Sequence, residues 1–174
     1  NDAKKFKEDS FNGFRLGFAS LEERALAEKI HWACAKEIAN IIEIEGIEHA
    51  DLRDINKILA STYYANFSIF QSIPDTWAIN QIFPIIPIHR HKEKPLINAT
   101  FADLTCDSDG KLNSFINNGN IKTLLKLHEL IDNQEYYVGI FLAGAYQEAL
   151  GNLHNLFGNT NIIHIDINQN NSYK

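Results

Sequence analysis

Methionine is absent from the 174 residues, including the first position, and cysteine occurs only twice, as Cys34 and Cys106. Two cysteines are too few for a disulfide scaffold, so we expect a reducing, cytoplasmic compartment. The sequence also begins in the middle of a residue pattern and ends just as abruptly. Together with the missing methionine, this predicts a piece of a longer protein.

Long apolar runs and basic clusters are also missing. No run approaches the roughly 20 apolar residues that cross a bilayer, and no secretory signal opens the chain. The net charge is −6, and the richest basic stretch, HRHKEK at 89–94, is typical of a solvated loop. We therefore expect neither a membrane nor a nucleic-acid partner.

The first third of the chain has a helical pattern. Ser20 and Glu23 have the spacing of a capping box ahead of apolar residues at helical intervals, and Gly46 is placed to end that helix. A second, shorter helix is predicted over 49–61. These helices form a predicted N-terminal segment, residues 1–61.

From Thr62 onward, short blocks of β-branched and aromatic residues alternate with turn formers. A helix is predicted within the segment 144–158. Strands are predicted over 63–70, 82–88, 97–104, 121–127, 136–142 and 162–167. We therefore predict an α+β chain whose second domain, residues 62–174, is a β-barrel or sandwich.

The stretch TCDSDG carries a thiol and two carboxylates just after a predicted strand. Cys106 could donate a proton, and Asp107 and Asp109 could pair with a guanidinium through two parallel hydrogen bonds. The alternative is an acidic turn in which the carboxylates accept hydrogen bonds from their own backbone. Residue types alone favour the turn.

The stretch GAYQEALG places Tyr146 near the start of the predicted helix. Free backbone amides at a helix start favour an anion such as a phosphate, and the tyrosine hydroxyl could join them. The alternative is a buried tyrosine bonded to backbone. His89 and His91 could bind a metal, but no third ligand is near, so we predict no metal-ligand set in this sequence.

Three stretches in this order resemble the bacterial biosynthetic arginine decarboxylase family: YYANFSIFQSIPDTWAINQIFPIIPI, LTCDSDG and GAYQEALGNLHNLFG. The resemblance runs from about residue 16 to 167. LEERALAEKIHWACAKEI is similar to the helical bundle inserted in that family. The resemblance implies the second, β domain of a pyridoxal-phosphate decarboxylase of the alanine racemase and ornithine decarboxylase fold type (fold type III).

The resemblance implies roles for particular residues. Cys106 matches the thiol that handles the proton at the substrate α-carbon, and Asp107 matches the carboxylate that holds the distal cation. Asp109 is a second candidate for substrate binding, and Tyr146 matches the tyrosine that contacts the cofactor phosphate. The region of Asp75 and Asn80 is where relatives place another acidic substrate contact.

The family resemblance further implies that L-arginine is converted to agmatine and CO2 for polyamine synthesis (putrescine and spermidine). It implies pyridoxal 5'-phosphate and Mg²⁺ as cofactors and a homo-oligomer whose active site lies between subunits. No stretch matches the catalytic TIM-type barrel with its cofactor-bearing lysine, so we expect these residues alone to be inactive. Two alternatives remain: a non-catalytic dimerisation or binding module of this fold, and a decarboxylase for ornithine, lysine or diaminopimelate.

Overall fold

The structure is a computed structural model that describes residues 2–46, 50–153 and the single positions 161, 163 and 165. The chain divides into two compact units, Asn1–Ala60 and Ser61–Lys174. The predicted α+β class, with helices first and strands after them, is confirmed. None of the described helices is long and apolar enough to cross a membrane.

The first unit contains α1 (Asp2–Arg15), α2 (Leu21–Glu45) and α3 (Ala50–Ile58). The predicted capping box of α2 is confirmed. The Ser20 hydroxyl accepts a hydrogen bond from the Glu23 amide at 3.2 Å, and the Glu23 carboxylate accepts one from the Ser20 amide at 2.7 Å. These bonds satisfy donors that a helix start leaves unpaired.

The end of α2 is also as predicted. Gly46 follows the last helical turn with φ 63°, in the left-handed region, and its amide donates to the Ile42 carbonyl. A glycine adopts this conformation without the steric cost that a Cβ would impose. Helix α1 was not predicted as a separate element, and it packs along α2 through Phe11, whose ring lies 4.9 Å from the Arg24 guanidinium.

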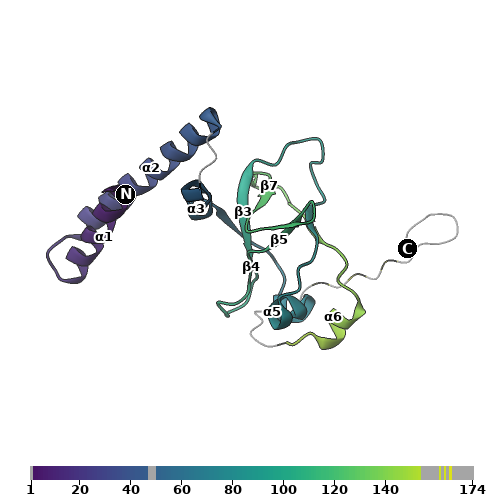
Figure 1. Cartoon of the computed structure of the whole chain (residues 1–174). Helices are drawn as coiled ribbons and strands as arrows, with labels where there is room; N and C mark the ends of the chain where they lie inside the picture. Colours follow the sequence, from purple (N-terminus) through teal and green to yellow (C-terminus); the bar gives the residue numbers. More distant parts are fainter. Residues whose placement is uncertain (1, 47–49, 154–160, 162, 164, 166–174) are drawn as a thin grey trace. The chain divides into compact units, whose positions relative to one another are not determined.

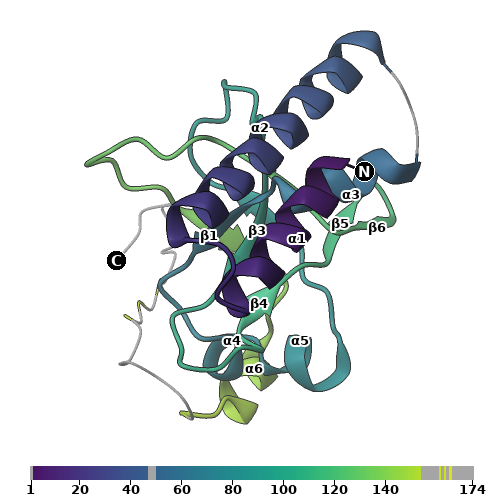
Figure 2. The same ribbon diagram turned by 90° about the vertical axis from the view of Figure 1, so that its left-hand side faces the viewer.

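The second unit is built on a four-stranded sheet centred on β3 (Ile97–Ala102) (Figures 1 and 2). Strand β1 (Ser61–Tyr64) runs parallel to β3 on one side. On the other side β3 pairs antiparallel with β7 (Leu125–Leu127) at its start and with β4 (Lys111–Leu112) at its end.

Two antiparallel ribbons complete the β structure. One pairs β2 (Ile85–Pro87) with β8 (Val138–Ile140), and the other pairs β5 (Phe115–Asn117) with β6 (Asn120–Lys122). Within the part of the chain that the structure describes, no closed barrel forms. The expected barrel or sandwich is therefore seen here as one open sheet with two ribbons.

Several predicted strand boundaries were wrong. The predicted strand 63–70 stops at Tyr64, because Ser68 accepts a hydrogen bond from the Gln71 amide and so caps α4 (Ile69–Ser72). Helix α5 (Pro74–Ile79) follows in a stretch for which no helix was predicted, with its proline in the first turn, a position that proline favours.

Other boundaries differ in the later part of the chain. The predicted strand 121–127 is split between β6 and β7. Helix α6 (Ala145–Leu150) occupies the start of the segment predicted to contain a helix, and 154–158 lie outside the described residues. Most of the predicted strand 162–167 also lies outside them. Helices α4, α5 and α6 gather at one end of this unit (Figure 2).

The core of the second unit lies between the sheet and the helix α4. Tyr63 of β1 stands beside Phe101 of β3, and Ile69, Phe115 and Leu127 are almost completely buried. Each such side chain contributes about 1.5–3 kcal/mol when it leaves water. Because Ile69 opens α4, this core fixes where α4 stands relative to the end of β3.

Candidate functional site

The segment TCDSDG forms a tight connection between β3 and β4. The Asp103 amide donates to the Gly110 carbonyl at 2.7 Å, which closes the base of the turn. Inside it, the Gly110 amide donates to the Asp107 carbonyl at 3.3 Å and the Lys111 amide to the Asp109 carbonyl at 2.8 Å. We name residues 103–110 the acidic turn.

The side chain of Asp107 takes part in the hydrogen bonding of this turn. Its carboxylate accepts a hydrogen bond from the Asp109 amide at 2.9 Å, and its own amide donates to the Thr105 hydroxyl at 3.3 Å. This is the acidic-turn geometry that the residue types favoured.

Cys106 lies at the exposed side of the acidic turn, and its thiol is not part of a disulfide. Asp107 is half-buried and Asp109 is exposed. The thiol is therefore accessible to a partner, and it is not enclosed in the apolar core.

Two cavities flank the acidic turn, and they separate its two candidate carboxylates. A cavity of about 480 Å³ is lined by Asp107 together with Tyr64 and Thr105. A second cavity of about 510 Å³ is lined by Asp109 together with Trp77 and Asn80. The two cavities adjoin each other, since Lys111, Leu112 and Asn113 line both of them.

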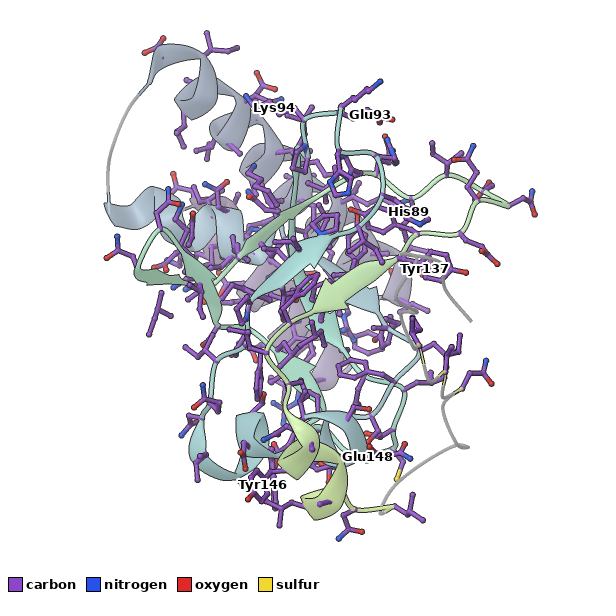
Figure 3. The ribbon with its side chains drawn as sticks, turned by 90° about the vertical axis from the view of Figure 1, so that its right-hand side faces the viewer. His89, Glu93, Lys94, Tyr137, Tyr146 and Glu148 are labelled. Atoms are coloured by element: carbon purple, nitrogen blue, oxygen red, sulfur yellow. The ribbon has the colours of Figure 1, made fainter. Side chains whose placement is uncertain are left out.

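Tyr146 lies on the first turn of α6 and is 80% exposed (Figure 3). It is therefore not the buried tyrosine of the alternative interpretation. Open space surrounds Gly144 at the start of this helix, where an added Cβ would meet nothing within 4 Å. An exposed hydroxyl beside open backbone is compatible with a phosphate group. Neither cavity beside the acidic turn has Tyr146 in its lining.

The neighbour of Tyr146 anchors α6 to α5. Gln147 is buried, and its side-chain amide donates to the Asp75 carboxylate at 2.5 Å. In return, the Asp75 backbone amide donates to the Gln147 side-chain oxygen at 3.2 Å. Asp75 therefore serves as a support for the helix that carries Tyr146, whereas Asn80 lines the cavity beside Asp109.

Sequence reasoning missed a buried carboxylate at the base of the acidic turn. Asp103 is 5% exposed and accepts hydrogen bonds from the Ile69 amide at 2.9 Å and from the Thr105 hydroxyl at 2.8 Å. The alternation of buried residues along β3, at Ala99 and Phe101, continues to Asp103. That alternation was the available signal, because it places an acidic residue on the apolar face.

A second polar cluster lies away from the predicted site residues. His128 is buried, and its ring nitrogens lie 2.8 Å from the Tyr136 hydroxyl and 3.0 Å from the Glu93 carbonyl oxygen. The Tyr63 hydroxyl donates to the His128 carbonyl at 2.9 Å, and burial raises the pKa of Tyr63. With its ring nitrogens satisfied by these partners, His128 acts as a packing residue.

A cavity of about 760 Å³ adjoins this cluster and is lined by Tyr63, Tyr136 and Tyr137 among others, but by none of the predicted site residues. Tyr137 also stacks edge-on against His89, with ring centroids 4.9 Å apart (Figure 3). His89 is thus engaged with an aromatic ring. Within the described residues, no group of three or more His, Cys, Asp or Glu side chains could hold a metal ion.

Comparison with known proteins supports the interpretation of the motifs. Residues 1–56 match the model of the arginine decarboxylase helical bundle domain. Biosynthetic arginine decarboxylase of Prochlorococcus marinus strain MIT 9215 is 71% identical over all 174 residues, and that of strain SARG is 60% identical over the same length. The chain spans 27% of the length of each of these relatives.

A solved structure agrees with the sequence relatives. The crystal structure of the biosynthetic arginine decarboxylase from Campylobacter jejuni is similar to this chain, with a TM-score of 0.68 and 33% identity. The matched region covers 99% of this chain and 26% of the Campylobacter jejuni chain. The predicted resemblance is thereby confirmed, and it extends beyond the expected residues 16–167 to the whole chain. The 174 residues are related throughout to the biosynthetic arginine decarboxylases and correspond to about a quarter of such a protein.

Proposed function

We propose that this chain is a segment of an arginine decarboxylase that converts L-arginine to agmatine and CO2, in the synthesis of polyamines. The observation that carries the proposal is the exposed Cys106 beside Asp107 in a turn next to a cavity, in a chain related to arginine decarboxylases along its whole length. The non-catalytic module is not favoured, because the relatives described above carry the name of an enzyme.

Asp107 is proposed to bind the guanidinium of the substrate. A planar guanidinium presents two parallel N–H groups, and a carboxylate accepts both with more strength than it accepts from a neutral donor. Asp107 lines the cavity of about 480 Å³, which places it where a side chain of this kind could enter. A substrate with a shorter or singly charged end would leave this carboxylate poorly paired, which selects for arginine.

Cys106 is proposed to deliver the proton that replaces the carboxylate. When the bond between the α-carbon and the carboxylate breaks, its electron pair stays on the substrate as CO2 departs. The thiol S–H bond then breaks, its proton goes to the α-carbon, and solvent returns a proton to the thiolate. The exposed position of Cys106 suits both exchanges.

Pyridoxal 5'-phosphate, when bound, would supply the electron sink that makes loss of CO2 possible. Tyr146 is proposed to donate its exposed hydroxyl to a phosphate oxygen of this cofactor, while Gln147 holds α6 against Asp75. The proposed enzyme also needs the cofactor-bearing lysine of a catalytic barrel, so we expect the isolated 174 residues to be inactive.

Three further proposals rest on the family resemblance alone. The active protein is proposed to be a homo-oligomer with its sites between subunits. It is proposed to act in the cytoplasm, and to require Mg²⁺ bound outside the residues described here.

The proposal is tested with the full-length protein and a panel of arginine, ornithine, lysine and diaminopimelate. Agmatine should be the main amine formed, whereas preferred use of another diamino acid, or no amine from any of them, would refute the proposal. Replacing Asp107 with Asn should raise KM for arginine by about 10- to 100-fold, because a charged partner of the guanidinium is lost.

Asp109→Asn is the matched variant for this test. It removes a carboxylate from the same turn but from the other cavity. Its effect on KM should be smaller than that of Asp107→Asn. An equal or larger effect would reassign the guanidinium contact to Asp109.

A further inference from the structure

The carboxylate of Asp103 is buried under the acidic turn and bonded on two sides. One oxygen accepts from the Ile69 amide at 2.9 Å, and the other from the Thr105 hydroxyl at 2.8 Å. A buried carboxylate costs several kcal/mol in lost hydration unless such bonds compensate it. Two directed bonds from different segments therefore fix this side chain in one position.

The returning arm of the turn lies directly against the same carboxylate. A Cβ added at Gly110 would overlap the Asp103 side chain, so the backbone of Gly110 approaches it closer than any other residue type allows. The Asp103 amide also bonds the Gly110 carbonyl at 2.7 Å. Both arms of the acidic turn are therefore held in place by contacts with Asp103.

Thr105 extends this control to the two candidate site residues. Its hydroxyl donates to Asp103 and accepts from the Asp107 amide at 3.3 Å. Cys106 lies between Thr105 and Asp107 in the chain. The hydrogen bonds that Thr105 makes with Asp103 and with Asp107 therefore constrain the backbone that carries the thiol.

The other partner of Asp103 connects the turn to the helix that carries Tyr146. Ile69 is the first residue of α4, and in α4 the Phe70 carbonyl accepts a hydrogen bond from the Asn152 amide at 2.8 Å, just after α6. Gly151 lies so close to α4 that an added Cβ would overlap the Gln71 carbonyl. A continuous set of contacts therefore runs from the acidic turn through Asp103 and α4 to α6.

We propose that Asp103 is a positioning residue, which holds Cys106 and Asp107 at a fixed place relative to α6 and Tyr146. This inference rests on the function proposed above. Asp103 lines the cavity of about 480 Å³ with Asp107, but it is only 5% exposed and its oxygens are engaged with Ile69 and Thr105, so its proposed role is indirect. It acts by setting the backbone of the acidic turn.

Asp103→Asn in the full-length enzyme tests the proposal. An amide presents one acceptor oxygen where the carboxylate presents two, so either the Ile69 bond is lost or the Thr105 bond is lost or reversed. Because a misplacement of about 1 Å is enough to slow catalysis strongly, the resulting shift of the thiol should lower kcat/KM for arginine by about 10- to 100-fold. The matched control, Asp132→Asn, changes an exposed carboxylate elsewhere in the same unit and should leave kcat/KM unchanged.

The double variant Asp103→Asn with Asp107→Asn separates positioning from a general loss of structure. If Asp103 acts through the turn, the two substitutions together should reduce kcat/KM by clearly less than the product of their separate effects. Independent, multiplicative effects would overturn the proposal.

A second pair of variants covers the case in which Asp103→Asn fails to fold. Thr105→Val removes the hydroxyl that links Asp103 to Asp107, and Thr105→Ser restores it. The valine variant should reproduce the loss in kcat/KM and the serine variant should recover most of it. Equal activity in both would overturn the proposal.

Hydrogen exchange gives a readout that does not depend on activity. In Thr105→Val and Asp103→Asn, the amides of 65–72 and 103–112 should exchange faster than in the wild type, whereas unchanged exchange in both segments would contradict the proposed coupling. A wild-type protein that leaves arginine intact would refute the proposed function. The exchange data would then still decide whether Asp103 orders the turn.

Discussion

At the scale of single residues, the acidic turn depends on the fit between Gly110 and Asp103. The glycine has no side chain to displace the buried carboxylate, and the carboxylate occupies the space that any Cβ would need. The exposed residues of the turn include the candidate functional side chains, whereas the buried pair of Asp103 and Gly110 determines the conformation of the turn.

Gly110→Ala is expected to destabilise the protein by about 1–3 kcal/mol, the usual cost of forcing extra volume into a packed site. Urea unfolding of the 174-residue chain would measure this. Ser108→Ala is the control, since Ser108 is exposed in the same turn and its loss should change stability by less than about 0.5 kcal/mol. Comparable stability of the two variants would mean that the turn tolerates a Cβ beside Asp103.

Much of the acidic turn could be predicted from residue types. Asp, Ser and Gly in this order indicate a turn in which a carboxylate accepts from the backbone, and Asp107 does so. The roles of Asp103 and Ile69 could not be predicted, because their bond joins residues 34 positions apart. The separation of Asp107 and Asp109 into two cavities likewise follows from tertiary packing.

At the scale of elements, local signals decided which boundaries were predictable. Helix α2 was predictable because its capping residues, Ser20 and Gly46, directly flank it in the sequence. Helices α4 and α5 were not, because each is shorter than the window over which a helical period can be recognised, and they are stabilised by contacts with the core and α6.

The helical unit contains a group whose titration should affect its stability. Burial lowers the pKa of His31 from its usual 6.5, and the nearby Lys7 and Lys4 lower it further, against smaller opposing effects of a backbone hydrogen bond with Ala3 and of Glu8. The folded state therefore binds a proton on His31 less readily than the unfolded state. Stability from this group is complete above pH 6.5 and is lost as the pH falls below it.

Helix α1 and helix α2 should therefore be less stable at about pH 5.5 than at about pH 7.5, within the range where histidine titrates. Hydrogen exchange of the α1 and α2 amides, corrected for the intrinsic effect of pH, measures this. His31→Gln should lose part of the pH dependence. An identical dependence in wild type and variant would show that His31 does not contribute.

At the scale of the whole molecule, the chain corresponds to 27% of the length of its relatives, so the proposed decarboxylation would also need residues from the rest of the protein. Cys106 and Asp107 come from the turn after β3, and Tyr146 comes from α6. The resemblance to arginine decarboxylases could be predicted from motifs in the sequence, because TCDSDG and GAYQEALG keep the order and residue types of that family. The open sheet could not be predicted, because its arrangement depends on which strands pair.

The most direct test of the proposed function follows the products of arginine in the full-length enzyme with Cys106→Ala. Our account predicts that agmatine formation falls at least about 100-fold, or that an aldehyde replaces agmatine, because the proton no longer reaches the α-carbon. Cys34→Ala, which removes the other exposed thiol, should retain wild-type turnover. If Cys106→Ala forms agmatine at the wild-type rate with no other product, the thiol has no part in the reaction and the account is wrong.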